Sequence, residues 1–150
     1  MGKETRLQVV ESVWIDDIFP GLVGPGYSVT SSPTDQYNCI AWAAEDDSEW
    51  WSHLQSYRWP ADRTHSVESL VAVFVSLGYE VCDSNSLEEG YDKVAIYAHS
   101  GLWKHAARQL PSGQWTSKLG PDEDIEHTTL EGLCGEPYGI VHCIMRRRLT

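Results

Sequence analysis

The sequence lacks any apolar run long enough to cross a membrane. A membrane-spanning helix needs about 20 consecutive apolar residues, and no stretch of this 150-residue chain approaches that length. The N-terminal segment MGKETRLQVVESVW also lacks the basic and then apolar pattern of a secretory signal. We therefore expect no membrane association and a cytoplasmic location, while delivery by a secretion route without a cleaved signal stays open.

Positive charge is also scarce. The chain has 11 Lys and Arg against 22 Asp and Glu, which gives a formal net charge of −11. Binding to nucleic acid needs clustered Lys and Arg that contact phosphates, and the only basic run is MRRRLT at residues 145–150. We expect no nucleic-acid partner. A basic protein partner suits this charge better, so an acidic immunity or inhibitor protein is one alternative function.

Cysteine pairs with the spacing of a metal site are absent. The four cysteines, Cys39, Cys82, Cys134 and Cys143, are widely spaced and form no CxxC motif. Structural zinc sites usually take their ligands from such close pairs, and disulfide frameworks are typical of secreted chains. The sequence therefore predicts free thiols, no bound metal and no cofactor.

What is present is enough apolar material for one ordinary core, since 41% of the 150 residues are hydrophobic. We expect a single domain over residues 1–150, with an N-terminal arm and loop over residues 1–34 and a core with the Cys and His candidates over residues 35–150. Residues 6–15 predict a short helix or strand. Residues 19–36 are rich in Gly, Pro and Ser and predict a long loop.

Hydrophobic periodicity predicts helices first and a sheet afterwards. A helix is expected from Cys39 to about Trp51, and SVESLVAVFVSLG, which begins at Ser66, predicts a second one. Short alternating segments then predict strands, namely YEVC, KVAIYAH, WKHAARQL, QWTSKLG and YGIVHCIMRR. PSG predicts a hairpin turn, and DEDIEHTTLEGL a short helix or an ordered loop. The fold class is therefore α+β, with N-terminal helices on a mostly antiparallel sheet.

Cys39 is the residue best suited to carry function. It follows a polar loop at the predicted start of a helix, where the helix dipole lowers the pKa of a thiol. A nearby imidazole adds to this effect, and His105, at the head of a predicted strand, is the best candidate. The alternative is structural, because free cysteines are often buried in cores and a half-buried histidine is often satisfied by a backbone carbonyl.

The segments around both residues resemble papain-like cysteine hydrolases, especially the CHAP amidase and peptidase family. There a cysteine opens a helix with an aromatic and a small residue three and four positions on, as Trp42 and Ala43 follow Cys39. The histidine begins a strand that enters a hairpin, as in HAARQLPSGQWTSKLG. The resemblance implies a papain-like architecture, a nucleophile at Cys39, a base at His105 and a protein or peptide-like substrate.

A longer pattern resembles an uncharacterised group of bacterial domains and spans most of the chain from about residue 35 onward. It comprises YNCIAWAA, KHAARQL, QWTSKLG and DEDIEH. This resemblance implies no particular activity. It does imply that certain residues belong to motifs of the group, namely His105, Ser117, Lys118, Asp124 and His127.

A third group usually orients the imidazole of a Cys/His pair, and in papain-like enzymes it is an Asn, Asp or Glu on or after the next strand. The hairpin puts His105 opposite about residue 120, so a carboxylate just beyond Gly120 can reach it. We favour Asp124 over Asp122, because Asp124 lies in the DEDIEH motif, and Ser117 is a further candidate. The candidate oxyanion or substrate-binding residues are Gln36, Asn38, Trp42, Ser117, Lys118 and His127.

Together these observations predict a papain-like thiol hydrolase or acyltransferase that acts on an amide or ester bond. The main alternative is a noncatalytic module in which the tryptophan-rich segment EWWSHLQSYRW, residues 49–59, binds a protein partner and Cys39 merely packs. Two further residues also have structural alternatives. Lys118 can pair with the acids that follow it, and His127 can cap the segment after DEDIEH.

Overall fold

The computed structural model describes residues 13–149. Residues 13–18 are helical, whereas residues 6–12, the first part of a segment predicted as a short helix or strand, lie outside the described residues. Within residues 13–149, no helix is long and apolar enough to cross a membrane.

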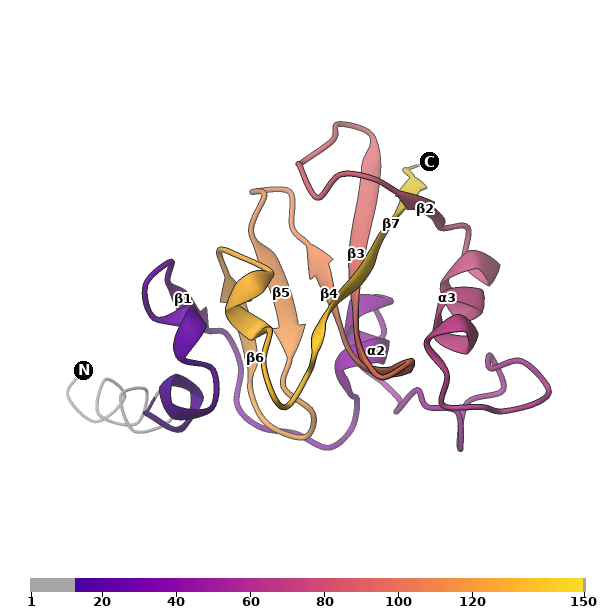
Figure 1. The fold of residues 1–150 in the computed structure, drawn as a ribbon, viewed down its shortest axis with the longest axis horizontal. Coiled ribbons are helices and arrows are strands. Elements are labelled where there is room, and N and C mark those ends of the chain that lie inside the picture. Colours follow the sequence, from indigo (N-terminus) through magenta and orange to yellow (C-terminus); the bar gives the residue numbers. More distant parts are fainter. Residues whose placement is uncertain (1–12, 150) are drawn as a thin grey trace.

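Seven antiparallel strands form one sheet in the described part of the chain, in the spatial order β1-β6-β5-β4-β3-β7-β2 (Figure 1). The helices are few and short, and the fold class is α+β with an antiparallel sheet, as the alternating segments predict. The strands are β1 (Tyr27–Val29), β2 (Glu80–Cys82), β3 (Tyr91–His99), β4 (Leu102–Gln109), β5 (Trp115–Lys118), β6 (Asp124–His127) and β7 (Ile140–Arg148).

Two strands lie where the sequence pattern predicts none. β1 is part of the segment predicted as a long loop, and β6 is the DIEH of a segment predicted as a short helix or an ordered loop, so both predictions are wrong at these positions. The reason is tertiary, because β6 pairs with β5 on one side and β1 on the other. Two short 3-10 helices, η1 (Pro20–Leu22) and η2 (Glu131–Leu133), lie in the same two segments.

Helix α2 (Cys39–Ala43) begins where the sequence predicts but is shorter than expected. Its N-cap is Asn38, whose side chain accepts a hydrogen bond from the backbone N–H of Ala41. The helix ends early because Glu45 adopts a left-handed backbone conformation, with φ of 66°, and the N–H of Asp46 turns back to the carbonyl of Ala41. The expected continuation to about Trp51 is therefore wrong.

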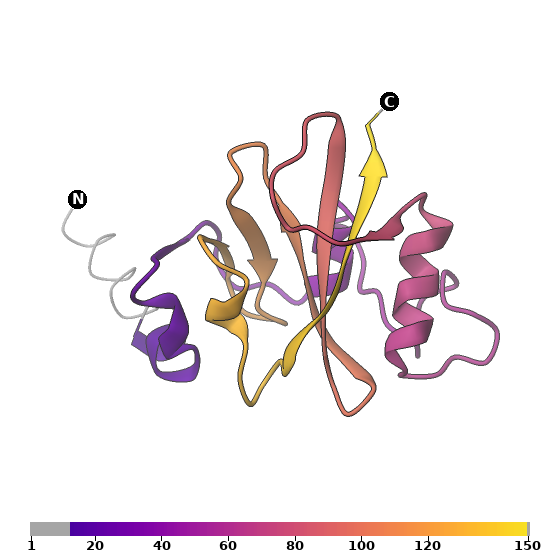
Figure 2. The same ribbon diagram turned by 45° about the horizontal axis from the view of Figure 1, so that its top comes forward.

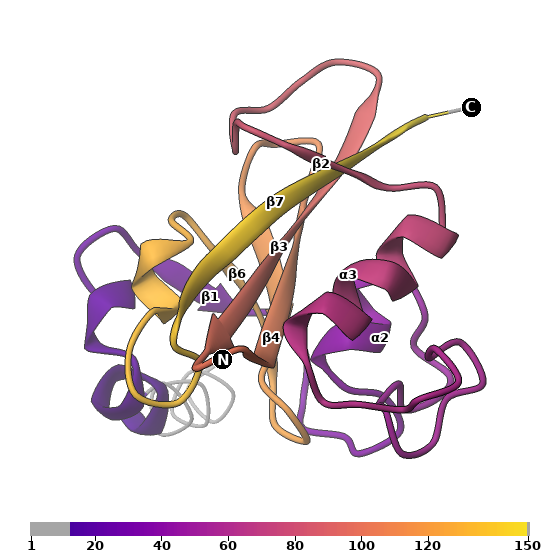
Figure 3. The ribbon, with the colours of Figure 1, turned by 45° about the vertical axis from the view of Figure 1, so that its right-hand side comes forward.

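Helix α3 (Val67–Ser76) confirms the second predicted helix, with Ser66 as its N-cap. Figures 2 and 3 show α2 and α3 together on one face of the sheet, while residues 13–18, η1 and η2 lie against the other face. The sheet is thus covered on both sides. This explains why its central strands are buried on both faces.

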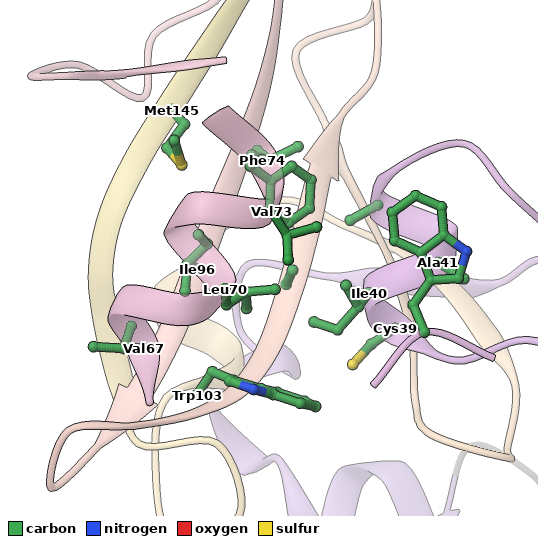
Figure 4. Close-up of a cluster of buried hydrophobic side chains, with 14 of the residues drawn as sticks. Cys39, Ile40, Ala41, Val67, Leu70, Val73, Phe74, Ile96, Trp103 and Met145 are labelled. Carbon is green, nitrogen blue, oxygen red and sulfur yellow. The ribbon is translucent and has the colours of Figure 1, made fainter. Parts of the chain in front are cut away.

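Two hydrophobic clusters fill these two interfaces, and β3 contributes to both because its side chains alternate. Ile96 packs in the first cluster with α2 and α3, and Tyr97 in the second with η1 and η2. Figure 4 shows the first cluster, where Cys39 extends from α2 and its sulfur points toward Trp103. Cys39 is therefore part of a packed interior.

The sheet opens between β4 and β5. In the described residues these strands pair only at Arg108↔Thr116 and Gln109↔Trp115, whereas β3 pairs with β4 from Val94 to His99. Helix α2 contacts both β4 and β5. The N-terminal half of β4, which carries the predicted base, therefore lacks a strand neighbour on the β5 side and faces the start of α2 instead.

Candidate active site

Asn38 determines the position of Cys39 at the start of α2. Its Oδ1 accepts from the backbone N–H of Ala41, at 3.2 Å, and from that of Trp51, at 3.0 Å. Its Nδ2 donates to the carbonyl of Trp51, at 2.8 Å. The Asn38 amide therefore joins the helix start to the tryptophan-rich segment through both acceptor positions of Oδ1 and one of the two hydrogens of Nδ2.

The Cys39 thiol is buried, with 6% of the residue exposed. Burial raises the pKa of this thiol to about 11, although the backbone at Ala106, Ile40 and Cys39 itself and the charge of Lys118 act in the opposite direction. The backbone of Ala106 therefore lies beside the sulfur, in the part of β4 that has no β5 neighbour. Residue 105 immediately precedes this contact.

His105 is fully buried on β4 and is held on several sides. Its Nε2 lies 2.9 Å from the Oγ of Ser117 on β5. Its ring stacks on Tyr138, with centroids 4.1 Å apart and planes 6° apart, and meets Tyr97 edge to face at 5.2 Å. These contacts restrict rotation of the imidazole.

Ser117 continues a hydrogen-bond chain from His105 to β6. The Oγ of Ser117 lies 2.8 Å from Nε2 of His127, and Nδ1 of His127 lies 2.9 Å from the backbone carbonyl of Thr129. Three neighbouring strands thus contribute one side chain each, because β5 lies between β4 and β6. Ser117 and His127 are both fully buried.

The last acceptor of this hydrogen-bond chain determines which atoms along it carry hydrogens. A carbonyl only accepts, so Nδ1 of His127 carries a hydrogen and, in the neutral ring, Nε2 is an acceptor. Ser117 then donates its hydroxyl hydrogen to His127 and accepts from the Nε2–H of His105. His105 is therefore the tautomer with a bare Nδ1, an assignment that follows from the hydrogen-bond pattern.

Both rings are neutral at neutral pH. Burial lowers the pKa of His127 to about 4, against a smaller opposite effect of the Thr129 carbonyl. Burial, and then the charge on His127, hold the pKa of His105 well below its ordinary value. Neutral imidazoles are the state that the alternating donors and acceptors of the chain require.

Cys39 and His105 approach β4 from different sides. Cys39 packs in the first cluster, whereas His105 pairs in register with Tyr97 of the second. The Nδ1 of His105 is buried and has no hydrogen-bond partner among the described residues. In this conformation the thiol and the imidazole therefore lie on opposite faces of the sheet, the thiol beside the backbone of Ala106 and the imidazole on the preceding residue, without a hydrogen bond between them.

Neither of the predicted orienting carboxylates hydrogen-bonds to His105 in the described structure. Asp124 Oδ2 accepts from the hydroxyl of Tyr37, at 2.8 Å, and its Oδ1 is buried without a hydrogen-bond partner in the described residues. Asp122 provides a backbone carbonyl to Lys118. The hydrogen-bonded neighbour of His105 is thus Ser117, the further candidate from the sequence.

Lys118 joins two loops near the start of α2. Its ammonium donates to the carbonyls of Thr34, at 2.8 Å, and Gly120, at 2.9 Å, and also to that of Asp122. It lies 5.2 Å from the centre of the Tyr37 ring. Burial lowers its pKa, against the charges of the nearby acids. These bonds anchor the loop that leads into Cys39.

The other predicted binding residues differ in their exposure. Gln36 is exposed. Trp42 is half-buried, donates from its indole N–H to Thr116 Oγ1, at 2.9 Å, and stacks on Tyr37. These contacts hold α2 against β5.

Sequence reasoning missed Tyr138 and Thr129. Tyr138 lies in a turn closed by a bridge between Gly135 and Gly139, and nothing in that segment signals a ring stacked on a histidine. Thr129 contributes only its backbone carbonyl, which any residue carries. Within residues 13–149, no group of three or more His, Cys, Asp or Glu side chains is arranged to hold a metal ion.

Comparison with known proteins gives one result. No curated protein and no solved structure matches the chain. Residues 28–146 match a family model described as a domain of unknown function, DUF7689. The matched range includes Cys39, His105, Ser117 and His127, and it covers most of the chain, so the protein belongs to the DUF7689 family.

Proposed function

We propose that this protein is a papain-like thiol hydrolase or acyltransferase with Cys39 as nucleophile and His105 as base. The observation that carries the proposal is the state of His105, whose Nδ1 is buried, bare and without a hydrogen-bond partner in the described residues. The thiol lies beside the backbone of the next residue, Ala106. Nucleophilic catalysis needs a thiol and a base with a vacant proton-accepting nitrogen, and these two groups lie beside consecutive residues of β4.

The proposed reaction uses both groups in turn. The Cys39 proton passes to Nδ1 of His105 as the sulfur electron pair forms a bond to the carbonyl carbon, whose π electrons move onto oxygen. When the carbonyl re-forms, the bond to the amine or alcohol breaks and the imidazolium gives that group its proton. Water, or an acceptor in the acyltransferase case, then attacks the thioester as its proton passes to Nδ1 of His105, and the imidazolium returns that proton to the sulfur when the bond to the acyl group breaks.

Burial makes the resting pair neutral. With a pKa of about 11 the thiol carries its proton at neutral pH, and the lowered pKa of His105 leaves the imidazole uncharged. Proton transfer therefore accompanies attack on the substrate rather than preceding it. Catalytic hydrogen bonds often tighten only once substrate is bound, so the absence of a Cys39–His105 bond in the free protein fits this sequence of events.

Backbone groups are the best oxyanion donors. The N–H of Cys39 at the first turn of α2 points where a helix has unsatisfied donors. The amide of Asn38 uses one of its two Nδ2 hydrogens to hold Trp51, which leaves one donor for an oxyanion. Gln36 is exposed and free to approach a substrate.

An activated ester tests the proposal without knowledge of the natural substrate. Purified protein is mixed with 4-nitrophenyl acetate, release of 4-nitrophenolate is followed, and peptide mass spectrometry locates the acetyl group. We expect acetylation of Cys39, loss of the signal in Cys39→Ala, and about 10²- to 10⁴-fold slower acetylation in His105→Gln. Cys82→Ala removes a half-buried thiol on β2 and is the matched control.

Two outcomes contradict the proposal. One is an unchanged rate in Cys39→Ala, and the other is acetylation confined to another residue in the wild type. Thermal unfolding of each variant establishes that a lost signal reflects chemistry rather than loss of the fold.

The alternative of a noncatalytic binding module also has a specific observation in its favour. Leu54 and Tyr57, in the tryptophan-rich segment, are each 76% exposed. Arg58 stacks on Trp51 at 4.1 Å and on Tyr57 at 4.4 Å, which stiffens this surface. A module of this kind predicts an inert Cys39, so the acetylation experiment separates the two functions.

A further inference from the structure

The histidine on β6 has a buried position that the proposed reaction does not use directly. We infer that His127 is a positioning residue, which acts through the Ser117 hydroxyl to keep the proton of His105 on Nε2 and its Nδ1 bare. This inference rests on the proposed function of Cys39 and His105. It assigns the third part of the site to a neutral relay of Ser117, His127 and the Thr129 carbonyl, instead of to a carboxylate.

The direction of the relay follows from its last acceptor. The Thr129 carbonyl, 2.9 Å from Nδ1 of His127, requires a hydrogen on that nitrogen. The donor and acceptor of the other two bonds are then determined. Ser117 has one hydroxyl hydrogen and lies 2.8 Å from His127 and 2.9 Å from His105, so it donates to His127 and accepts from His105. Reversing the proton on His105 would leave Ser117 with two acceptors and one hydrogen.

The surroundings make the wrong tautomer costly. Ser117, His127 and His105 are fully buried, so no solvent replaces a lost bond. The ring of His105 is also held between Tyr138, stacked at 4.1 Å, and Tyr97, edge-on at 5.2 Å. A ring flip that would move Nε2 away from Ser117 is therefore hindered by packing, and the hydrogen bonds of the relay determine which nitrogen carries the proton.

A neutral relay also differs chemically from a carboxylate. It orients the imidazole and determines its tautomer, but it provides no negative charge to stabilise an imidazolium. The site therefore holds a neutral thiol and a neutral base at rest. Where a tautomer is wrong in a related Cys/His or Ser/His site, the chemical step slows by as much as about 10⁴-fold.

Nitrogen NMR of protein with ¹⁵N-labelled histidine tests the inference directly. Coupling of ring nitrogens to ring protons identifies the tautomer of each histidine, and His105→Gln assigns the His105 signals. In the wild type we expect His105 with a bare Nδ1 and a protonated Nε2, and His127 with a protonated Nδ1. A protonated Nδ1 on His105 in the wild type overturns the inference, whatever the activity.

Variants then test the role of each member. His127→Phe removes the acceptor, which frees the Ser117 hydroxyl to donate to His105, so we expect the protonated-Nδ1 tautomer to appear. Acetylation by 4-nitrophenyl acetate should slow about 10²-fold or more, through the rate of acylation rather than ester binding. Slower acetylation with an unchanged tautomer overturns the positioning role.

Thr116→Val is the matched control for Ser117→Ala. Thr116 is the neighbouring residue on β5, but its hydroxyl faces the other side, where it bonds the carbonyl of Ile125 and the indole of Trp42. Ser117→Ala should mix the tautomers of His105, whereas Thr116→Val should leave them as in the wild type. Equal effects of the two substitutions contradict the relay.

The two proposals fail in distinguishable ways. An absence of Cys39 acetylation in a protein whose histidines have the expected tautomers defeats the proposed function and leaves the relay as a structural feature. The wild-type spectrum needs no variant, so the relay is tested even where Ser117→Ala or His127→Phe does not fold.

Discussion

Two pairs of histidines lie on opposite sides of the sheet, and they are built in different ways. His105 and His127 are fully buried and joined through Ser117. His53 and His65 are half-buried and touch directly, with parallel rings 4.7 Å apart that both meet Trp103 edge-on. One pair is connected by hydrogen bonds and the other by ring contact.

The difference shows what determines the tautomer of a buried histidine. In the first pair, a backbone carbonyl at one end determines every proton along the chain. In the second, only His65 is anchored, by Nε2 to the Trp103 carbonyl at 2.9 Å, while Nδ1 of His53 is buried without a hydrogen-bond partner in the described residues. A ring stack does not determine which nitrogen carries the hydrogen, so hydrogen bonds define the tautomers of both histidines only in the first pair.

The largest expected difference between the pairs is their effect on acid stability. His127 binds a proton near pH 6.5 in the unfolded chain but only near pH 4 in the folded one. Between these values the unfolded state holds more protons, so the free energy of unfolding falls as the pH falls. We expect a loss of about 3 kcal/mol from His127 between pH 7 and pH 4. Burial of His105 acts in the same direction.

Urea unfolding at a series of pH values measures this loss. His127→Phe should flatten the dependence, whereas the double change His53→Gln and His65→Gln should leave most of it. A wild-type free energy of unfolding that does not change between pH 7 and pH 4 would show that the buried pair accepts protons freely.

The next largest effect concerns the turn that covers His105. Gly139 has φ of 74°, and a Cβ there would collide with the carbonyl of Ala98. Gly139→Ala should therefore destabilise the protein by roughly 2 to 3 kcal/mol and displace Tyr138 from His105. Gly135→Ala, in the same turn, adds a Cβ with no atom within 4 Å. This variant therefore measures the cost of backbone strain without a steric collision. Thermal unfolding compares the two, and equal losses would rule out the collision.

The smallest effect is expected at the stacked pair. His65→Ala removes both the stack and the hydrogen bond to the Trp103 carbonyl, and we expect a loss of about 1 kcal/mol. His53→Ala removes the same stack but no hydrogen bond of the described structure, so its loss should be smaller. Denaturant unfolding measures both, and an equal or larger loss at His53 would show that the His65 hydrogen bond adds no measurable stability.

The regular elements were largely predictable because their signals are local. The Ser66 cap and the apolar period of the following residues predict α3, and two-residue alternation predicts β3, β4, β5 and β7. The failures have two different causes. Glu45 ends α2 early, and β6 forms in a segment without a clear strand signal because two other strands pair with it.

The residue types of the candidate site were predictable, but the hydrogen bonds between them were not. Cys39 and His105 could be named because a thiol at a helix start and a histidine before a hairpin are recognisable patterns. The choice between Ser117 and Asp124 as the partner of His105 could not be made from the sequence, because it depends on the face of β5 or β6 on which each side chain lies. Asp124 faces Tyr37, while Ser117 and His127 share the face of His105.

By itself the sequence determined the α+β class, the cap that starts α2 and the presence of a thiol and several histidines in suggestive places. Only the tertiary structure decided that the thiol is buried with a raised pKa, that Nδ1 of His105 is bare, and that a serine rather than a carboxylate is hydrogen-bonded to the His105 ring. The physical reason is that desolvation and hydrogen-bond direction depend on groups far apart in the chain. The backbone carbonyl of Thr129 is one such group, and no sequence pattern marks it.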